Sequence, residues 1–269
     1  MLAPGSGAPQ QAVWRRCGSI SLMDERLMQT MLDVDEHHWW YRGRRKVLRA
    51  ELDRLALPQA AEILDAGCGS GRTLDELVDY GTVRGIELDP EAAAVARARG
   101  RGEVLEGRLE ELPWPDDTFD LITCLDVLEH TADDRLTLRE LRRVSKSGGH
   151  LLLTVPAYPA LWSHHDEANH HFRRYKRGML RAAAAESGWR LERMTSFNSV
   201  LLAPAAAVRL VQRRRPSSEC RHDLVLGPAW LNSVLERPLT FEASLLARGR
   251  TLPVGLSLLA VLVNPGKGA

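Results

Sequence analysis

Short apolar runs and amphipathic stretches alternate along most of the chain. Runs with the length of buried β-strands lie at 61–66, 82–88, 103–106, 119–124 and 148–155, and stretches with helical periodicity lie at 72–80, 90–99 and 133–144. Strands that alternate with helices in this way imply right-handed crossovers and a mostly parallel, buried sheet. The pattern therefore predicts an α/β fold.

Further elements flank this core. A helical pattern covers 33–57 before it, and a helix at 177–187, a strand at 189–196 and a last strand at 256–263 follow it. Between the last two strands, residues 199–252 contain an apolar helix with a basic end and are too many for a plain connection. We expect this insertion to cover the functional site or to form the contact of a homodimer.

The overall charge and the apolar runs exclude several classes of protein. The chain has 36 Lys and Arg against 35 Asp and Glu, so it lacks a field that would attract nucleic acid. Its longest apolar stretches fall short of the roughly 18–20 residues that span a bilayer. The four Cys show no C-x-x-C spacing, and the first twenty residues lack the apolar core of a secretory signal. We expect a cytoplasmic protein with no nucleic-acid partner and no transmembrane segment.

The most informative stretch is the turn DAGCGSG at 65–71, between the first strand and the next helix. Its alternate glycines permit a tight turn and a close approach of a ligand to the backbone, and the following helix presents free N–H groups. Arg72 stands where a dinucleotide motif would need its third glycine, and Asp65 would repel a pyrophosphate. The carboxylate of Asp65 suits a ligand that carries an ammonium group.

A second carboxylate stands at the end of the next strand, in the sequence GIELDP at 85–90. From this position in a doubly wound sheet an acidic side chain accepts hydrogen bonds from both hydroxyls of a ribose, which is the role we expect for Glu87. Asp89, directly before Pro90, better fits the role of a cap for the next helix.

Four segments, at 63–73, 83–100, 106–130 and 138–156, resemble class I S-adenosylmethionine-dependent methyltransferases of the small-molecule type, in the order and spacing of that family. The resemblance implies a Rossmann-like, doubly wound sheet of seven strands whose last strand, 256–263, runs antiparallel. It also implies transfer of a methyl group from S-adenosyl-L-methionine to O, N or C of a small-molecule acceptor, with S-adenosyl-L-homocysteine as the product.

The resemblance further implies the cofactor-binding residues, which are Asp65, Gly67, Gly69, Gly71, Glu87, Leu88, Leu109, Leu125, Trp40 and Arg45. In the family pattern, Asp65 and Gly67 line the methionine part, Glu87 the ribose and Leu88 the adenine. The carbonyl of Cys124 or Leu125 receives the ammonium group. Arg108 stands where the family usually has an Asp that contacts the adenine amino group, so the backbone at Leu109, or Glu110, must supply that contact.

Residues 36–45 resemble the N-terminal lid helix of many relatives, in which an aromatic residue covers the cofactor and an arginine reaches its carboxylate. Trp40 and Arg45 are the candidates, with Arg42 as a substitute. The alternative is a helix that packs its two Trp rings into the core and exposes a solvated basic face. The chain then divides into a flexible tail (1–20), a lid-helix region (21–58), a cofactor-binding core (59–198), the helical insertion (199–252) and a final strand with its tail (253–269).

The loops after the fourth and fifth strands face the ligand in an open α/β sheet, and here they hold a cluster of His and Arg. Methyl transfer requires alignment, and it requires a base only when the acceptor starts protonated, which favours His because its pKa is near neutral. The candidate catalytic residues are the possible bases His165 and His170, Asp166 to orient the ring, Tyr175 as a second donor, and His130. The alternative is a polar loop that packs on the edge of the sheet.

Two further features of these loops suggest ligands. Asp126, Glu129 and His130 stand at i, i+3 and i+4, on one helix face, where a downstream His could complete a site for a divalent ion. Some O-methyltransferases of this fold use a similar Glu-x-x-Glu-His arrangement, but DVLEH also occurs in relatives that bind no metal, so we leave a metal unassigned. Arg173, Arg174 and Arg177 could bind a carboxylate or phosphate of the acceptor, or could begin a solvated helix.

Two other classes of function compete with small-molecule methylation. One is a cofactor-binding protein of the same fold that transfers no methyl group, although such a chain would be free to lose the glycines and Glu87. The other is an RNA or protein methyltransferase, which is disfavoured by the neutral charge and by the sequence LDVL at 125–128, where an Asn-Pro-Pro-Tyr-like element would be expected.

Overall fold

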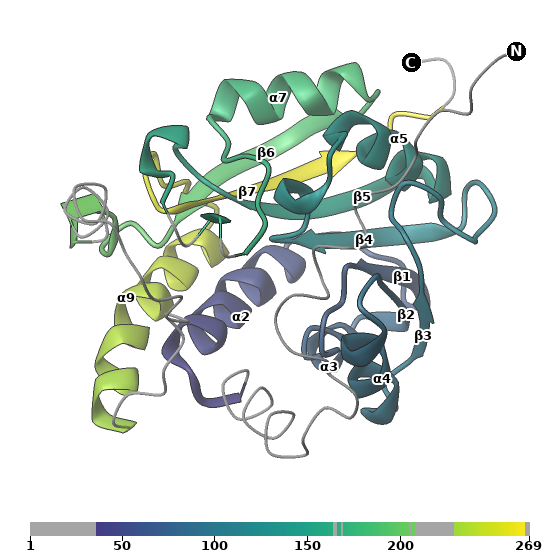
Figure 1. Cartoon of the computed structure of the whole chain (residues 1–269). Coiled ribbons are helices and arrows are strands. Elements are labelled where there is room, and N and C mark those ends of the chain that lie inside the picture. Colours follow the sequence, from purple (N-terminus) through teal and green to yellow (C-terminus); the bar gives the residue numbers. More distant parts are fainter. Residues whose placement is uncertain (1–35, 164–165, 168, 205, 208–228, 267–269) are drawn as a thin grey trace, which may run out of the picture.

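We describe residues 36–163, 166–167, 169–204, 206–207 and 229–266 of a computed structural model of the chain (Figure 1). Among these residues one sheet contains the strands β1 (Ala61–Ala66), β2 (Gly81–Glu87), β3 (Glu103–Glu106), β4 (Phe119–Leu125), β5 (Ser145–Pro156), β6 (Arg190–Phe197) and β7 (Ser257–Val263). Their order is β3-β2-β1-β4-β5-β7-β6, with β1 to β5 parallel and β7 antiparallel to β5 and β6. The predicted seven-stranded α/β sheet with a reversed last strand is confirmed.

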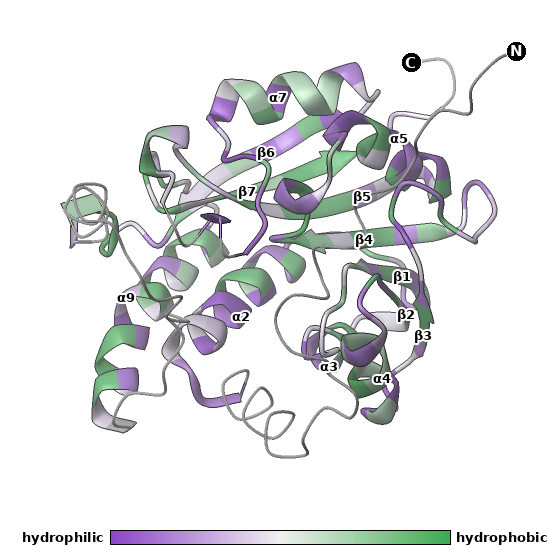
Figure 2. Ribbon diagram, viewed as in Figure 1, coloured by the Kyte–Doolittle hydropathy of each residue, from purple (hydrophilic) through white to green (hydrophobic). Residues whose placement is uncertain are grey.

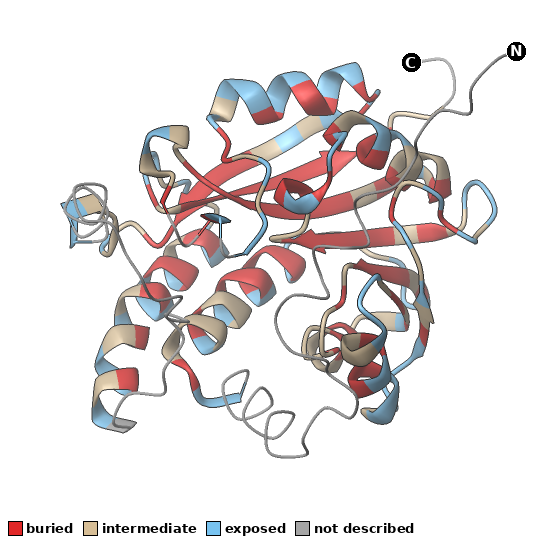
Figure 3. Ribbon diagram, viewed as in Figure 1, coloured by how far each residue is buried: buried red, intermediate tan, exposed pale blue. Residues whose placement is uncertain are grey.

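Helices cover both faces of this sheet. The helices α5 (Asp134–Val144) and α7 (Arg177–Glu186) lie on one face, and α2 (Trp39–Leu52), α3 (Leu74–Leu77), α4 (Pro90–Ala98) and α9 (Ala229–Ala247) lie on the other (Figure 1). Successive strand residues alternate between two cores: Leu64 and Leu153 face the first, and Ile63 and Leu152 face the second. Accordingly, Figure 3 shows the central strands buried almost throughout and the helices buried along one side.

The element boundaries follow local signals where such signals exist. Asp89 accepts the N–H groups of Glu91 and Ala92 at 2.9 Å each, so its expected role as the cap of α4 is confirmed. The helix expected at 72–80 is reduced to the single turn of α3, and the strand expected at 148–155 begins earlier, at Ser145. The first helix begins at Trp39 in the described part of the chain, and the expected tail 1–20 lies outside it.

The helices α2 and α9, far apart in sequence, pack side by side (Figure 1). Their contact is close at Gly43, where an added Cβ would lie 2.4 Å from Cδ1 of Leu239. Glu236 of α9 pairs with Arg42 (3.0 Å) and Lys46 (2.6 Å) of α2. The described part of the insertion therefore covers the N-terminal helix, and the basic face of that helix has acidic partners.

The hydrophobic residues are concentrated in the sheet. Figure 2 shows the strands β4, β5 and β7 as predominantly hydrophobic, which fits a sheet covered on both faces. Within the described residues, no helix combines the length and the apolar character that a membrane crossing would require.

Candidate active site

The carboxyl ends of four parallel strands meet at one edge of the sheet, at Ala66, Glu87, Leu125 and Pro156. We call residues 65–71 and 87–89 the cofactor edge, and residues 126–130 with the described residues of 157–175 the acceptor wall. Both follow the ends of parallel strands, where ligands bind in open α/β sheets.

Asp65 is a buried carboxylate with an incomplete set of partners. The residue is 2% exposed; its Oδ1 accepts a hydrogen bond from Oγ1 of Thr123 (2.6 Å), and its Oδ2 has no hydrogen-bond partner among the described residues. Burial raises the pKa of Asp65 to about 6, against the opposing effects of Thr123 and Arg44. Because a buried oxygen without a donor is costly, an ammonium group of a ligand would complete this site.

The glycine turn leaves space beside this carboxylate. Gly67, Gly69 and Gly71 have φ values of 78°, 54° and 79°, which suit glycine. A Cβ at Gly67 would lie 2.5 Å from Val127, whereas around a Cβ at Gly69 no described residue beyond its chain neighbours comes within 4 Å. The backbone at Gly69 is therefore open to a ligand.

Glu87 closes the turn at the end of β2. Its Oε2 accepts the N–H of Gly69 (2.8 Å), and its Oε1 accepts the N–H of Asp89 (3.0 Å). Each oxygen has a second lone pair, so the carboxylate can still accept hydrogen bonds from a ligand diol. Leu88 beside it is 56% exposed and offers an apolar surface to a flat ring.

Two residues of the next loop bear on the expected adenine contact. Arg108 points into solvent with its guanidinium 3.5 Å from Glu110, and the side chain of Leu109 is buried in the core. Leu109 can therefore reach a ligand through its backbone, as the sequence suggests.

Arg44, which the sequence analysis did not single out, reaches the cofactor edge from α2. Its Nη2 donates to the Leu125 carbonyl (3.0 Å), and its Nε lies 3.1 Å from Oδ2 of Asp126. The expected residue, Arg45, points toward α3, with its Nε 3.7 Å from Oε1 of Glu76. Neighbouring residues of a helix point about 100° apart, so these two arginines face different elements.

Trp40, the expected cover of the cofactor, is partly buried and packs against the core. Its ring stacks on Phe197 with a centroid distance of 5.8 Å and an interplanar angle of 11°. Arg42, the substitute for Arg45, pairs with α9 as described above. The described arrangement of Trp40 corresponds to the alternative in which the rings of this helix join the core.

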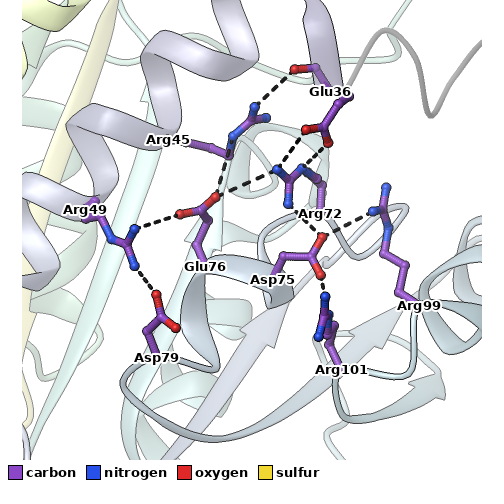
Figure 4. A network of polar contacts seen from close by, with 9 residues as sticks. All are labelled: Glu36, Arg45, Arg49, Arg72, Asp75, Glu76, Asp79, Arg99 and Arg101. Carbon is purple, nitrogen blue, oxygen red and sulfur yellow. Dashed lines mark hydrogen bonds and ion pairs between the residues drawn. The ribbon is translucent and has the colours of Figure 1, made fainter.

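An ion-pair network joins α2 to the helices that follow the glycine turn (Figure 4). Glu76 of α3 lies 3.7 Å from both Arg45 and Arg49, and Asp75 accepts from Arg72 at 2.7 Å. Glu36, Arg99, Arg101 and Asp79 extend the network. Each exposed ion pair contributes little to folding stability, but together these pairs connect α2 to the segment that follows the glycine turn of the cofactor edge.

On the acceptor wall, Asp166 orients a histidine that the sequence did not select. Its Oδ1 lies 2.9 Å from Nδ1 of His171 and accepts Nε–H of Arg174 (2.6 Å), and its Oδ2 accepts the N–H of Ser163 (2.9 Å). Burial alone would raise the pKa of Asp166, but the hydrogen bonds from His171, Arg174 and Ser163 hold it well below its ordinary value. Asp166 thus stays ionised and orients His171; the expected His165 lies outside the described residues.

Glu129 and His130, the end of the 3₁₀ turn η2 (Leu128–His130), face His171. The rings of His130 and His171 lie 4.7 Å apart at 86°, and one ligand atom from each of the three residues lies within 4.8 Å of the others. Glu129 is 1% exposed, and its burial and the nearby Asp126 raise its pKa well above the ordinary value. Partial burial of the ring and the neighbouring His171 lower the pKa of His130.

The other predicted catalytic residues of the loop after β5 do not join this group of side chains. His165 is outside the described residues, and His170 is exposed, with a φ of 55°. Tyr175 is 1% exposed and donates its hydroxyl to Oδ2 of Asp134 (2.9 Å), so its hydroxyl is bound inside the protein.

The three arginines of this segment bind the chain itself. Arg173 donates to the Ala132 carbonyl (2.6 Å), Arg174 pairs with Asp166, and Arg177 donates to the Leu252 carbonyl (2.7 Å). These contacts hold the loop after β5 in place.

The sequence itself matches methyltransferases. Residues 64–153 match the family Methyltransf_11, described as a methyltransferase domain. Over 140 residues the chain is 33% identical to the Mycobacterium tuberculosis protein named "Probable S-adenosylmethionine-dependent methyltransferase Rv3030", across 51% of this chain and 48% of that protein. Over 143 residues it is 27% identical to the demethylmenaquinone methyltransferase of Bacillus licheniformis, across 50% of this chain and 59% of that one. The chain spans about half the length of the curated relatives it matches.

A solved structure supports the same fold. The chain is similar to a chain of the complex that contains the Haloferax volcanii Trm112 methyltransferase activator, with a TM-score of 0.60 and 22% identity, over 91% of this chain and 97% of that chain. At this identity the likeness shows the fold. Residues 64–153 match a methyltransferase domain, and the motifs in this segment are those of class I S-adenosylmethionine-dependent methyltransferases.

Proposed function

We propose that the chain transfers a methyl group from S-adenosylmethionine to an O, N or C atom of a small molecule. The observation that carries the proposal is the buried Oδ2 of Asp65, which has no partner in the described part of the chain and lies beside the open glycine turn. An ammonium group fits this oxygen, and Glu87 is placed to accept from a diol one strand away. The names of the two curated relatives support the same activity.

On the cofactor edge, each part of the ligand has a candidate residue. S-adenosylmethionine, when bound, supplies an electrophilic methyl carbon on its sulfonium sulfur. Thr123 fixes one oxygen of Asp65 and leaves the other for the ammonium group. We assign the carboxylate of the ligand to Arg44 in place of Arg45, because the Arg44 guanidinium already lies at the Leu125 carbonyl.

The remaining predicted contacts belong to the same proposal. Glu87 would bind the ribose and Leu88 the adenine face, and the backbone of Leu109, or Glu110, would contact the adenine amino group. The exposure of Leu88 and the position of Glu87 at the strand end support these assignments.

On the acceptor wall, alignment of the acceptor is the main task, since positioning contributes on the order of 7–11 kcal/mol to such reactions. If the acceptor enters protonated and no metal is bound, the removal of its proton belongs to His130 and His171; the expected His165 lies outside the described residues. Asp166 fixes the ring of His171 for that step.

Cofactor binding tests the first half of the proposal. Calorimetric titration with S-adenosylhomocysteine should show binding to the wild-type chain, and Glu87→Gln should weaken it by about tenfold or more, because charge-assisted hydrogen bonds to the diol are lost. The matched control is Glu106→Gln. Glu106 is an exposed glutamate at the end of β3, and its backbone lies opposite that of Glu87 in the sheet. An equal loss in both variants would contradict the ribose assignment.

Turnover tests the second half. The chain is incubated with S-adenosylmethionine and either hydroxylated aromatic compounds, chosen because one relative is named for demethylmenaquinone, or small amines. Acceptor-dependent release of S-adenosylhomocysteine is the expected result. Cofactor binding with no methylated product from either pool would favour the alternative, a cofactor-binding protein without methyl transfer.

A cytoplasmic location and a homodimer through 199–252 are further predictions, and sedimentation of the full chain tests the dimer.

A further inference from the structure

The acceptor wall contains a cluster of groups that commonly bind metals. Glu129 and His130 come from the turn after β4, and His171 comes from the loop after β5. The main-chain hydrogen bond from Phe172 N–H to the Glu129 carbonyl (2.7 Å) holds these two segments together. As a result, one carboxylate and two imidazoles lie within 4.8 Å of one another through their ligand atoms.

The charges around this cluster leave one group without a counterion. Asp126 is paired with Arg44 (3.1 Å), and Asp166 is paired with Arg174 (2.6 Å). Glu129, buried between them, has an Oε2 for which the described residues supply no hydrogen-bond partner. Buried charges are normally paired or bound to a metal, so a cation at this cluster would satisfy the ionised form of Glu129.

Both imidazoles are held in the way that metal-bound histidines are held. Nδ1 of His171 lies 2.9 Å from the ionised Asp166, and the ring of His130 is hydrogen-bonded to the backbone of Asn169. Such outer contacts fix the orientation of a metal-bound ring. His130 is exposed, which gives an ion a path from solvent.

We propose that Glu129, His130 and His171 bind one divalent transition-metal ion of the Zn²⁺ type. Two nitrogen ligands and one carboxylate favour Zn²⁺ or Co²⁺ over Mg²⁺ and Ca²⁺, which prefer oxygen. Asp126, the first residue of the spacing seen in the sequence, is paired with Arg44 and is not part of the cluster. Three protein ligands leave a coordination position open for an oxygen of the acceptor.

This site also narrows the class of acceptor, provided that the chain is a methyltransferase as proposed above. A hydroxyl group bound to a divalent ion loses its proton to solvent more readily than a free one, as metal-bound water does. The oxygen that remains on the ion would then attack the methyl carbon; the new O–C bond forms as the C–S bond of the sulfonium breaks, and S-adenosylhomocysteine leaves with that electron pair. The site therefore favours acceptors with a hydroxyl group.

Metal binding by the full chain tests the site without reference to turnover. After removal of metals with a chelator, Zn²⁺ is titrated in competition with a chromophoric chelator, and one ion per chain is expected. Glu129→Gln, which keeps the shape of the side chain, and His171→Ala should each weaken binding by at least tenfold. Asp166→Asn should weaken it about 10- to 100-fold through loss of the outer contact.

Matched variants control for adventitious binding and for loss of folding. His150→Ala and Glu106→Gln remove the same groups elsewhere and should leave Zn²⁺ binding unchanged. Titration with S-adenosylhomocysteine on the same samples shows that each variant is folded. The proposal is overturned if the folded Glu129→Gln and His171→Ala variants bind Zn²⁺ like the wild type, or if His170→Ala abolishes binding while His171→Ala retains it. Zn²⁺ binding without S-adenosylhomocysteine binding would instead overturn the proposed function and leave the metal site in place.

Discussion

The cofactor edge and the acceptor wall lie at the same end of the sheet but are assembled differently. The cofactor edge is built by consecutive, paired strands, and Glu87 after β2 binds the backbone of Gly69 after β1. The acceptor wall joins segments that are distant in sequence, through contacts such as Phe172 N–H to the Glu129 carbonyl. The geometry of the first region follows from strand order, whereas that of the second depends on a buried ionic group, Asp166. We therefore expect substitutions in the first region to lower cofactor affinity, and substitution of Asp166 in the second to lower folding stability without changing that affinity.

The largest expected effect is that of Asp166→Asn. The change leaves the guanidinium of Arg174, which is 3% exposed, without its buried counterion, so the free energy of unfolding should fall by about 3–5 kcal/mol. Urea denaturation measures this loss. Affinity for S-adenosylhomocysteine in the folded fraction should be unchanged, because the cofactor edge is independent of this contact.

Two controls make this test specific. Asp79→Asn removes an aspartate whose exposed side chain pairs with Arg49, and it should change stability by less than about 1 kcal/mol. Adding Arg174→Met to Asp166→Asn should recover part of the lost stability. A double variant no more stable than the single one would mean that the ion pair is not the cause.

The next effect concerns Asp65 and pH. Its pKa of about 6 in the folded chain lies above the ordinary value of 3.8, so the folded state holds the proton more tightly than the unfolded state. This contribution is present below pH 4 and is lost as pH rises through 6, a decrease in unfolding free energy of about 3 kcal/mol. Urea denaturation between pH 4 and pH 7 should show this decrease in the wild type relative to Asp65→Asn.

The same residue should make cofactor affinity depend on pH in the opposite direction. S-adenosylhomocysteine should bind the wild type more tightly as pH rises through 6, because only the ionised carboxylate attracts the ammonium group. Asp65→Asn should bind about 10- to 100-fold more weakly at pH 7 and show no change near pH 6. Wild-type affinity that stays constant from pH 5 to pH 7 would remove Asp65 from the ammonium site.

The smallest expected effect on stability is that of Gly43→Ala in helix α2, which carries Arg44 to the cofactor edge. Gly43→Ala places a Cβ against Leu239, so overpacking of about 1–3 kcal/mol should outweigh the gain in helix propensity, about 1 kcal/mol. Thermal denaturation should show a lower midpoint, with weaker S-adenosylhomocysteine binding because Arg44 moves with the helix. The control is Gly178→Ala in α7, where the described residues leave open space around the added methyl, and it should raise the midpoint. Equal stabilisation by both changes would mean that α2 and α9 do not pack tightly.

Much of the fold and most of the cofactor edge could be predicted from the sequence, because both follow from short-range patterns. Apolar runs give the strands, and the residues at strand ends, Asp65 and Glu87, necessarily meet at one edge once the strands are parallel. Asp89 was recognisable as a cap from its place before Pro90. In each case the decisive neighbours lie within a few residues or one strand away.

The missed residues depend on contacts that no local pattern contains. Arg44 rather than Arg45 faces the Leu125 carbonyl because of the rotation of α2 about its axis, and Gly43 of that helix packs against Leu239. His171 faces Glu129 because the loop after β5 folds back onto the turn after β4. In the sequence, the only sign of a close helix contact was Gly43 inside the predicted helix 33–57. That glycine does not show that α9 is the packing partner.

The pairing of α2 with α9 has a consequence for related chains. Neither helix lies within the segment 64–153 that the family shares, yet each covers the apolar side of the other and shares its ion pairs. Deletion of either helix would expose the apolar side of the other helix and remove the partners of its ion pairs. The two segments should therefore be inherited as a unit, present together or missing together, although six of the seven strands lie between them in the sequence.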